Sequence, residues 1–184
     1  MPISSPAGTS DSSLTLLLAS PDATHEFGRK LGAAVPAGQV IALSGELGAG
    51  KTTLTQGIAV GMGVTARVTS PTFTLINQYQ PGKRRLLLVH IDTYRLGDDA
   101  ASAQNEALNL GIDEILNDAP EPDDASAGAV VVIEWAERIR ELLPPTTLYI
   151  HLEAAPDHAD ARNATISALG PEVEKLRRLL GSTA

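Results

Sequence analysis

A glycine-rich segment that ends in a lysine and a threonine is the part of the sequence best suited to bind phosphate. Residues 45–52 read GELGAGKT and fit the pattern G-x-x-x-x-G-K-[ST] in full. Glycines lack a Cβ, so the backbone N–H groups of such a loop can turn inward around a phosphate. In this pattern the lysine bridges the β- and γ-phosphates, and the last hydroxyl binds Mg²⁺. The residues expected to surround the phosphates are therefore Gly45, Gly48, Ala49, Gly50, Lys51 and Thr52.

The segments on either side of this loop have the patterns that a phosphate loop requires. Residues 39–44 form an apolar run typical of a buried strand, and Leu54, Ile58 and Met62 recur every four residues, as on one helix face. The order strand, loop, helix aims the positive end of the helix at the bound anion. A glycine-rich turn that merely precedes a helix is the alternative, and the complete motif between a strand and a helix argues against it.

Two carboxylates each follow a buried apolar strand. Residues 86–91 lead into Asp92, and residues 130–133 lead into Glu134. The carboxyl ends of parallel strands meet at one edge of a sheet, which is where ligands bind in doubly wound folds. We expect one acid to meet Mg²⁺ and the other to meet the attacking water or the hydration shell of the metal. Each could instead only cap the next helix, and spacing alone does not rank the two.

Three further features lie near these acids, and each has a structural and a functional interpretation. His90 is expected to pack or to bridge neighbouring groups rather than act as a base. Trp135 follows Glu134, so it lies near the nucleotide or a partner surface, or else packs in the core. Residues 69–72 (TSPT) hold three hydroxyls, as in a switch segment that senses a γ-phosphate or in the polar start of a strand.

The rest of the chain alternates between strand and helix patterns. Strands are expected at residues 14–19, 39–44, 72–79, 86–91, 130–133, 148–152 and 164–169. Helices are expected at residues 21–35, 51–62, 101–110, 112–117, 136–143 and 172–180. Residues 72–91 resemble an antiparallel hairpin whose tip carries Lys83, Arg84 and Arg85, and residues 118–128 read as an exposed acidic loop.

This alternation predicts an α/β fold of the P-loop NTPase type. We expect a three-layer sandwich with a mostly parallel sheet plus an antiparallel hairpin. Residues 1–13 are expected to be a loose leader, and residues 14–184 a single P-loop ATPase domain.

Composition excludes several classes of protein. The 184 residues include no cysteine, so a disulfide framework, thiolate metal sites and cysteine nucleophiles are excluded. The longest apolar runs are far shorter than the ~20 residues of a membrane-spanning helix. The first ten residues contain no Lys or Arg ahead of an apolar stretch, unlike a secretory signal. We therefore expect a cytoplasmic protein with no membrane association.

Charge is distributed unevenly along a chain whose formal net charge is −8. Residues 28–85 hold seven bases and one acid, whereas residues 92–141 hold thirteen acids and three bases. A net negative charge opposes non-specific binding to nucleic acid. The charges are either solvated surface groups, or a front that faces a polyanion together with an acidic patch for a partner.

Four sequence blocks together resemble the TsaE (YjeE) family, the small ATPases of bacterial tRNA threonylcarbamoyladenosine synthesis. They are GELGAGKTTL at 45–54, SPTF at 70–73, HIDTYRL at 90–96 and IEW at 133–135. The resemblance spans roughly residues 14 to 170, and Ile91 and Thr93 depart from the usual HFDLYR.

The resemblance implies roles for individual residues. Thr52 and Glu134 are implied to bind Mg²⁺, Lys51 and its loop with Thr53 to hold ATP, and Asp92 to serve hydrolysis. Thr24 and Arg162 are implied to lie near the adenine or the ribose. The implied partners are a TsaB–TsaD pair that transfers a threonylcarbamoyl group to adenosine 37 of tRNA, with tRNA reached through that complex. Hydrolysis is expected to be slow and coupled to the partner.

Other nucleotide-binding classes are judged by the motifs they require. The four lysines provide no N/T-K-x-D motif of a GTPase, and the one run similar to the LSGGQ signature of transporters, at 43–46, overlaps the phosphate loop. A small-molecule or nucleoside kinase is a rival, but residues 97–137 contain no Lys or Arg for a charged lid. A third reading is a nucleotide-gated binding module, in which ATP orders a switch and docks a partner without turnover.

Overall fold

A computed structural model describes residues 12–80, 86–117, 128–156 and 158–168. The strands are β1 (Ser12–Leu18), β2 (Val40–Ser44), β3 (Ile76–Tyr79), β4 (Leu87–Asp92), β5 (Ala129–Glu134), β6 (Leu148–Ala155) and β7 (His158–Ala168). The helices are α1 (Pro21–Ala34), α2 (Lys51–Met62), α3 (Ala100–Asn109) and α4 (Ile112–Asn117), with a 3-10 segment η1 (Ala136–Leu142). No helix in these ranges is long and apolar enough to cross a membrane.

The seven strands form one sheet in the order β1-β7-β6-β2-β5-β4-β3. The central strands β6, β2, β5 and β4 pair in parallel, while β7 and β1 extend one side and β3 the other in antiparallel pairs. The β3–β4 pairing confirms the expected hairpin. The parallel centre puts the carboxyl ends of β2, β5 and β4 at one edge, where the candidate site residues lie.

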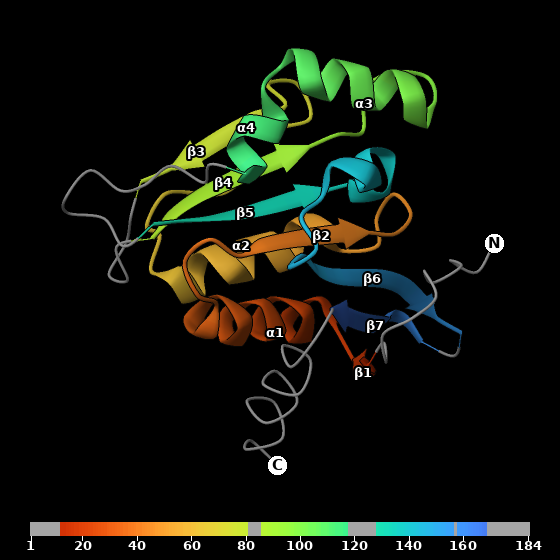
Figure 1. Cartoon of the computed structure of the whole chain (residues 1–184). Helices are drawn as coiled ribbons and strands as arrows, with labels where there is room; N and C mark the ends of the chain where they lie inside the picture. The colour runs from red at the N-terminus through yellow and green to blue at the C-terminus, as the bar shows by residue number, and fades with distance from the viewer. Residues whose placement is uncertain (1–11, 81–85, 118–127, 157, 169–184) are drawn as a thin grey trace.

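Helices cover both faces of the central sheet (Figure 1). One core lies under α1 and α2 and includes Ile41 and Leu43, while the other lies under α3, α4 and η1 and includes Val40 and Ala42. Successive residues of β2 therefore point into different cores. Residues 40–43 are all apolar because this parallel strand is buried on both faces. The three-layer α/β fold predicted from the sequence is confirmed.

Helices α1 and α2 approach closely through glycines on both of them. A Cβ atom on Gly32 would overlap the carbonyl oxygen of Ile58, and one on Gly57 would overlap that of His25. Only residues without a side chain allow the two backbones to come this close. The contact holds α2, and with it the phosphate loop at its N-terminus, against α1.

The strand expected at residues 72–79 is wrong in its first half. Leu75 has a positive φ of 64°, and its N–H donates to the carbonyl of Pro71 at 2.6 Å, so a turn precedes β3. Phe73, which lies in this turn, is 88% exposed. The alternation of apolar residues along the sequence gives no sign that one of them has a left-handed backbone conformation. That conformation turns the chain away from strand geometry.

Other elements also differ from expectation, among them β6, which ends at Ala155 rather than at residue 152. The helix expected at 136–143 is a 3-10 segment broken at Ile139, whose φ is −123°. The strands β1 and β7 begin earlier than expected, at Ser12 and His158. Helix α1 ends within one residue of the predicted end, with Ser20 capping it by accepting the Ala23 N–H at 3.1 Å. Lys83, Arg84, Arg85, most of the acidic loop and the helix expected at 172–180 lie outside the described residues.

Candidate nucleotide and metal site

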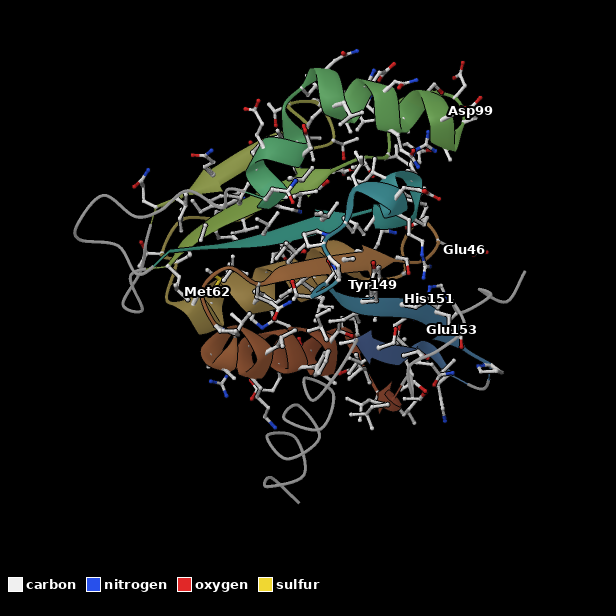
Figure 2. The ribbon with its side chains drawn as sticks, in the orientation of Figure 1. Glu46, Met62, Asp99, Tyr149, His151 and Glu153 are labelled. Atoms are coloured by element: carbon white, nitrogen blue, oxygen red, sulfur yellow. The ribbon has the colours of Figure 1, made fainter. Side chains whose placement is uncertain are left out.

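The phosphate loop lies between β2 and α2, as the motif predicts. Gly45 has a φ of 134°, and a Cβ there would overlap the carbonyl oxygen of Leu152 on β6. Gly50 has a φ of 102° and precedes the first residue of α2. Both conformations favour glycine, so these two positions explain the motif structurally. Figure 2 shows Glu46 of the loop at the same end of the sheet as His151 and Glu153 of β6, with Met62 at the opposite end.

Lys51 is folded back against its own loop. Its Nζ donates to the carbonyl oxygens of Gly45 at 2.6 Å and Glu46 at 2.9 Å, and the side chain is buried. The same Nζ lies 3.7 Å from the ring centroid of Trp135, a cation–π contact. Burial lowers the pKa of Lys51, which the charges of Glu134, Glu137 and Asp92 oppose. The ammonium group thus sits at the loop with its charge poorly solvated, a condition that a bound phosphate would relieve.

Thr52 and Glu134 meet directly beside the loop. The Thr52 Oγ1 donates to Glu134 Oε2 at 3.0 Å, and the Glu134 side chain is buried. A hydroxyl and a carboxylate oxygen are hard ligands of the kind that Mg²⁺ takes, together with waters and substrate phosphates. Among the described residues, no group of three or more His, Asp or Glu side chains could hold a metal on its own. The donor set therefore fits a magnesium ion completed by nucleotide and water.

The second oxygen of Glu134 is held from the interior. His90 Nε2 lies 2.9 Å from Oε1, and Thr55 Oγ1, which donates to the Lys51 carbonyl at 3.0 Å, lies 3.4 Å from the same oxygen. His90 is thus buried against this carboxylate through one ring nitrogen, which agrees with the expectation that it packs or bridges rather than acts as a base. The sequence motifs did not point to Thr55. Thr55 lies three residues after Thr52 and therefore shares a helix face with Thr52.

Asp92 lies beside Glu134 at the carboxyl edge, because the two residues are paired in the β4–β5 register. Its Oδ2 accepts hydrogen bonds from Ser70 at 2.6 Å and Thr72 at 2.8 Å, and its Oδ1 accepts one from the Tyr94 N–H at 2.9 Å. Two hydroxyls of the 69–72 segment, for which a switch and the polar start of a strand were both open interpretations, therefore contact the second candidate acid. The backbone contribution of Tyr94 could not have been foreseen from residue types.

Comparisons with known proteins identify the family. The family model described as "Threonylcarbamoyl adenosine biosynthesis protein TsaE" matches residues 18–164. The chain belongs to the TsaE family. A tRNA threonylcarbamoyladenosine biosynthesis protein TsaE from Bacillus subtilis is 38% identical over 156 residues, covering 85% of this chain and 86% of the relative. A protein of the same name from Nostoc sp. is 42% identical over 131 residues, covering 71% and 73%.

A solved structure agrees with this assignment. The crystal structure of Bacillus subtilis YdiB matches with a TM-score of 0.73 and 32% sequence identity, covering 96% of this chain and 100% of that one. This TsaE-family chain is thus placed, by family, in tRNA threonylcarbamoyladenosine biosynthesis.

Two aromatic residues complete the wall of the site in this TsaE-family protein. Trp135 has a left-handed φ of 61°, and its ring centroid lies 4.9 Å from that of Tyr94. The indole therefore contacts both Lys51 and an aromatic ring that is itself 47% exposed. Of the two interpretations of Trp135, the structure favours a position at the candidate nucleotide site over packing in the core.

The two outlying positions implied by the TsaE resemblance both border the loop. Arg162 Nη2 donates to the carbonyl oxygen of Gly48 at 3.3 Å. It lines a cleft of about 400 Å³ together with loop residues 46–49 and residues 151–154 of β6. Thr24 is buried, its hydroxyl donates to the Ser20 carbonyl at 3.2 Å, and its methyl group would lie 3.7 Å from a Cβ on Gly50. Thr53 is half-buried on α2 and follows Thr52.

Proposed function

We propose that this chain is a Mg²⁺-dependent ATPase that supports threonylcarbamoyl transfer to adenosine 37 of tRNA. The observation that carries the ATPase proposal is the 3.0 Å contact between Thr52 and Glu134 at the start of α2, directly beside a complete phosphate loop. The choice of adenine as the base rests on family membership.

Each group of the site has an assigned task. The N–H groups of the loop and the Lys51 ammonium bind the phosphates, and Lys51 exchanges its two carbonyl acceptors for β- and γ-phosphate oxygens. Thr52 and Glu134 would hold Mg²⁺, which would supply positive charge against the phosphate oxygens. Water attacks the γ-phosphorus while the bond from this phosphorus to the ADP oxygen breaks, which gives ADP and inorganic phosphate and releases a proton to solvent, with Asp92 orienting the water. Arg162 and the cleft of about 400 Å³ beside it receive the nucleoside.

A protein partner completes the proposal, and two exposed apolar side chains support it. Leu47 of the phosphate loop is 82% exposed, and Phe73, which follows the Asp92-bonded Thr72, is 88% exposed. Side chains of this kind are available for contact with another protein. The family resemblance names a TsaB–TsaD pair as that protein, and we propose that turnover is slow until the pair binds.

The net charge of the chain bears on how tRNA is reached. With a formal charge of −8, the chain is a poor autonomous binder of RNA, since phosphate neutralisation requires basic surface. We propose that tRNA contacts the complex rather than this chain alone, and that the acidic stretch 92–141 favours a basic surface of the partner.

Reconstitution tests the proposal. The chain is combined with a TsaB–TsaD pair, tRNA and a source of threonylcarbamoyl-adenylate, and modified adenosine per complex is measured with wild type and with Lys51→Ala. Wild type is expected to support repeated rounds and Lys51→Ala only about one. An equal multi-turnover yield without this chain would contradict the assignment. Rapid phosphate transfer from labelled ATP to a nucleoside or sugar would instead establish a kinase, and partner association dependent on ATP without any turnover would establish a gating module.

A further inference from the structure

The buried imidazole of His90 contacts Glu134, a residue proposed to bind the metal, but has no direct part in the proposed hydrolysis. Its side chain is 0% exposed, and it lies on the face of β4 that packs toward α2. Its Nε2 is 2.9 Å from Glu134 Oε1, whereas its Nδ1 has no hydrogen-bond partner in the described part of the chain. A buried ring nitrogen without a partner is unfavourable, so a wholly apolar residue would suit simple packing better.

The surroundings of the two ring nitrogens indicate which nitrogen carries the proton. A carboxylate oxygen only accepts hydrogen bonds, so Nε2 must be the donor toward Glu134. A proton on Nδ1 would be a buried donor without an acceptor, which costs more than a bare lone pair. The Glu134 carboxylate next to Nε2, and the absence of an acceptor for Nδ1 among the described residues, therefore favour the tautomer with its proton on Nε2.

This donor restricts the orientation of the carboxylate. The last torsion of a glutamate side chain is broad, so hydrogen bonds decide where its oxygens point. His90 on β4 lies 2.9 Å from Oε1 and donates to it, whereas the single hydroxyl proton of Thr55 on α2 is shared between the Lys51 carbonyl at 3.0 Å and Oε1 at 3.4 Å. Oε2 is consequently left facing Thr52 Oγ1, on the side of the phosphate loop.

We propose that His90 is a positioning residue that fixes Glu134 so that Oε2 faces the magnesium position. This inference rests on the proposed function, since it assumes that Thr52 and Glu134 bind the metal. His90 touches neither nucleotide nor metal and acts through the carboxylate alone. Groups that hydrogen-bond to a metal-ligating carboxylate commonly change metal affinity by about 10–100-fold when removed.

The test compares two variants of the full chain. His90→Met removes the donor at similar bulk, whereas His90→Gln offers a side-chain N–H that can reach the place of Nε2. Binding of Mn²⁺, as a spectroscopic substitute for Mg²⁺, is measured by electron paramagnetic resonance in the presence of ATP. ATP binding in EDTA and the melting temperature are measured alongside.

For His90→Met we expect Mn²⁺ affinity to fall about tenfold or more, while ATP affinity in EDTA stays within about threefold of wild type. His90→Gln is expected to recover most of the Mn²⁺ affinity. Unchanged Mn²⁺ affinity in His90→Met, or equal losses in both variants at wild-type melting temperature, would overturn the proposal and leave His90 a packing residue. If wild type itself binds no Mn²⁺ with ATP, the proposed metal site fails instead.

His90→Asn keeps the test decisive if His90→Met does not fold. The asparagine side chain puts its amide nitrogen in the place of Nδ1 and is too short to donate to Glu134 Oε1, whereas the amide nitrogen in His90→Gln can reach it. The same assay should therefore show a loss of Mn²⁺ affinity of about tenfold or more in His90→Asn. Wild-type Mn²⁺ affinity in His90→Asn would contradict the view that the His90 donor orients the metal-binding oxygen.

Discussion

The Nζ of Lys51 lies 3.7 Å from the ring centroid of Trp135, the single tryptophan of the chain. Phosphate binding by Lys51 would change the charge next to this indole. We therefore expect ATP, added in EDTA, to change Trp135 emission in a saturable way, measured by fluorescence titration. Lys51→Met is the matched control, because it removes the ammonium and should abolish the response. A full response in that variant would mean that the indole senses something other than Lys51.

The same lysine should be costly for stability and necessary for binding. Burial lowers its pKa, so the folded protein holds this proton less tightly than the unfolded chain. The resulting penalty is fully present below the folded-state pKa and disappears as the pH rises toward the unfolded value. Lys51→Met should thus leave the free energy of unfolding unchanged or higher at neutral pH, measured by urea denaturation. Its ATP affinity should fall about tenfold to a hundredfold, the range for one lost charged hydrogen bond.

Substitutions at Glu134 should separate binding of the nucleotide from turnover. Glu134→Gln keeps an oxygen that can accept from His90 but weakens the metal site, so we expect near-normal ATP binding and strongly reduced hydrolysis. Glu134→Ala should show the same kinetic pattern and lose about 1–3 kcal/mol of stability, because the His90 donor is left buried without an acceptor. Unaltered hydrolysis in Glu134→Ala would transfer the metal to Asp92.

Much of this site could be predicted from sequence because its determinants are local. The motif at 45–52 fixes a loop between β2 and α2, and apolar runs ending in Asp92 and Glu134 fix two neighbouring carboxylates. What sequence could not supply depends on tertiary contact or on single backbone torsions. Thr55 becomes relevant only because α2 packs against β5, and the left-handed Leu75 breaks a strand that side-chain alternation favours.

The close contact between α1 and α2 predicts a large stability loss at one glycine. Gly32→Ala would force a methyl group into the carbonyl of Ile58, and we expect a cost of about 1–3 kcal/mol or more by overpacking. Gly38→Ala is the control. Nothing lies within 4 Å of a Cβ there, and its φ of 78° should cost only about 1–2 kcal/mol. Both are measured by urea denaturation, and a Gly32→Ala loss no larger than the control would mean that the helices move apart readily.

The hydroxyls on Asp92 should act on turnover through that residue. Ser70 and Thr72 both donate to its Oδ2, so removing them with Ser70→Ala and Thr72→Val leaves a carboxylate oxygen without these donors and free to reorient. We expect slower single-turnover hydrolysis in the double variant and in Asp92→Asn, with ATP affinity in both within about threefold of wild type. Because the hydroxyls work through one carboxylate, adding the double substitution to Asp92→Asn should slow hydrolysis little further. Fully additive losses would instead show that Ser70 and Thr72 reach the nucleotide independently of Asp92.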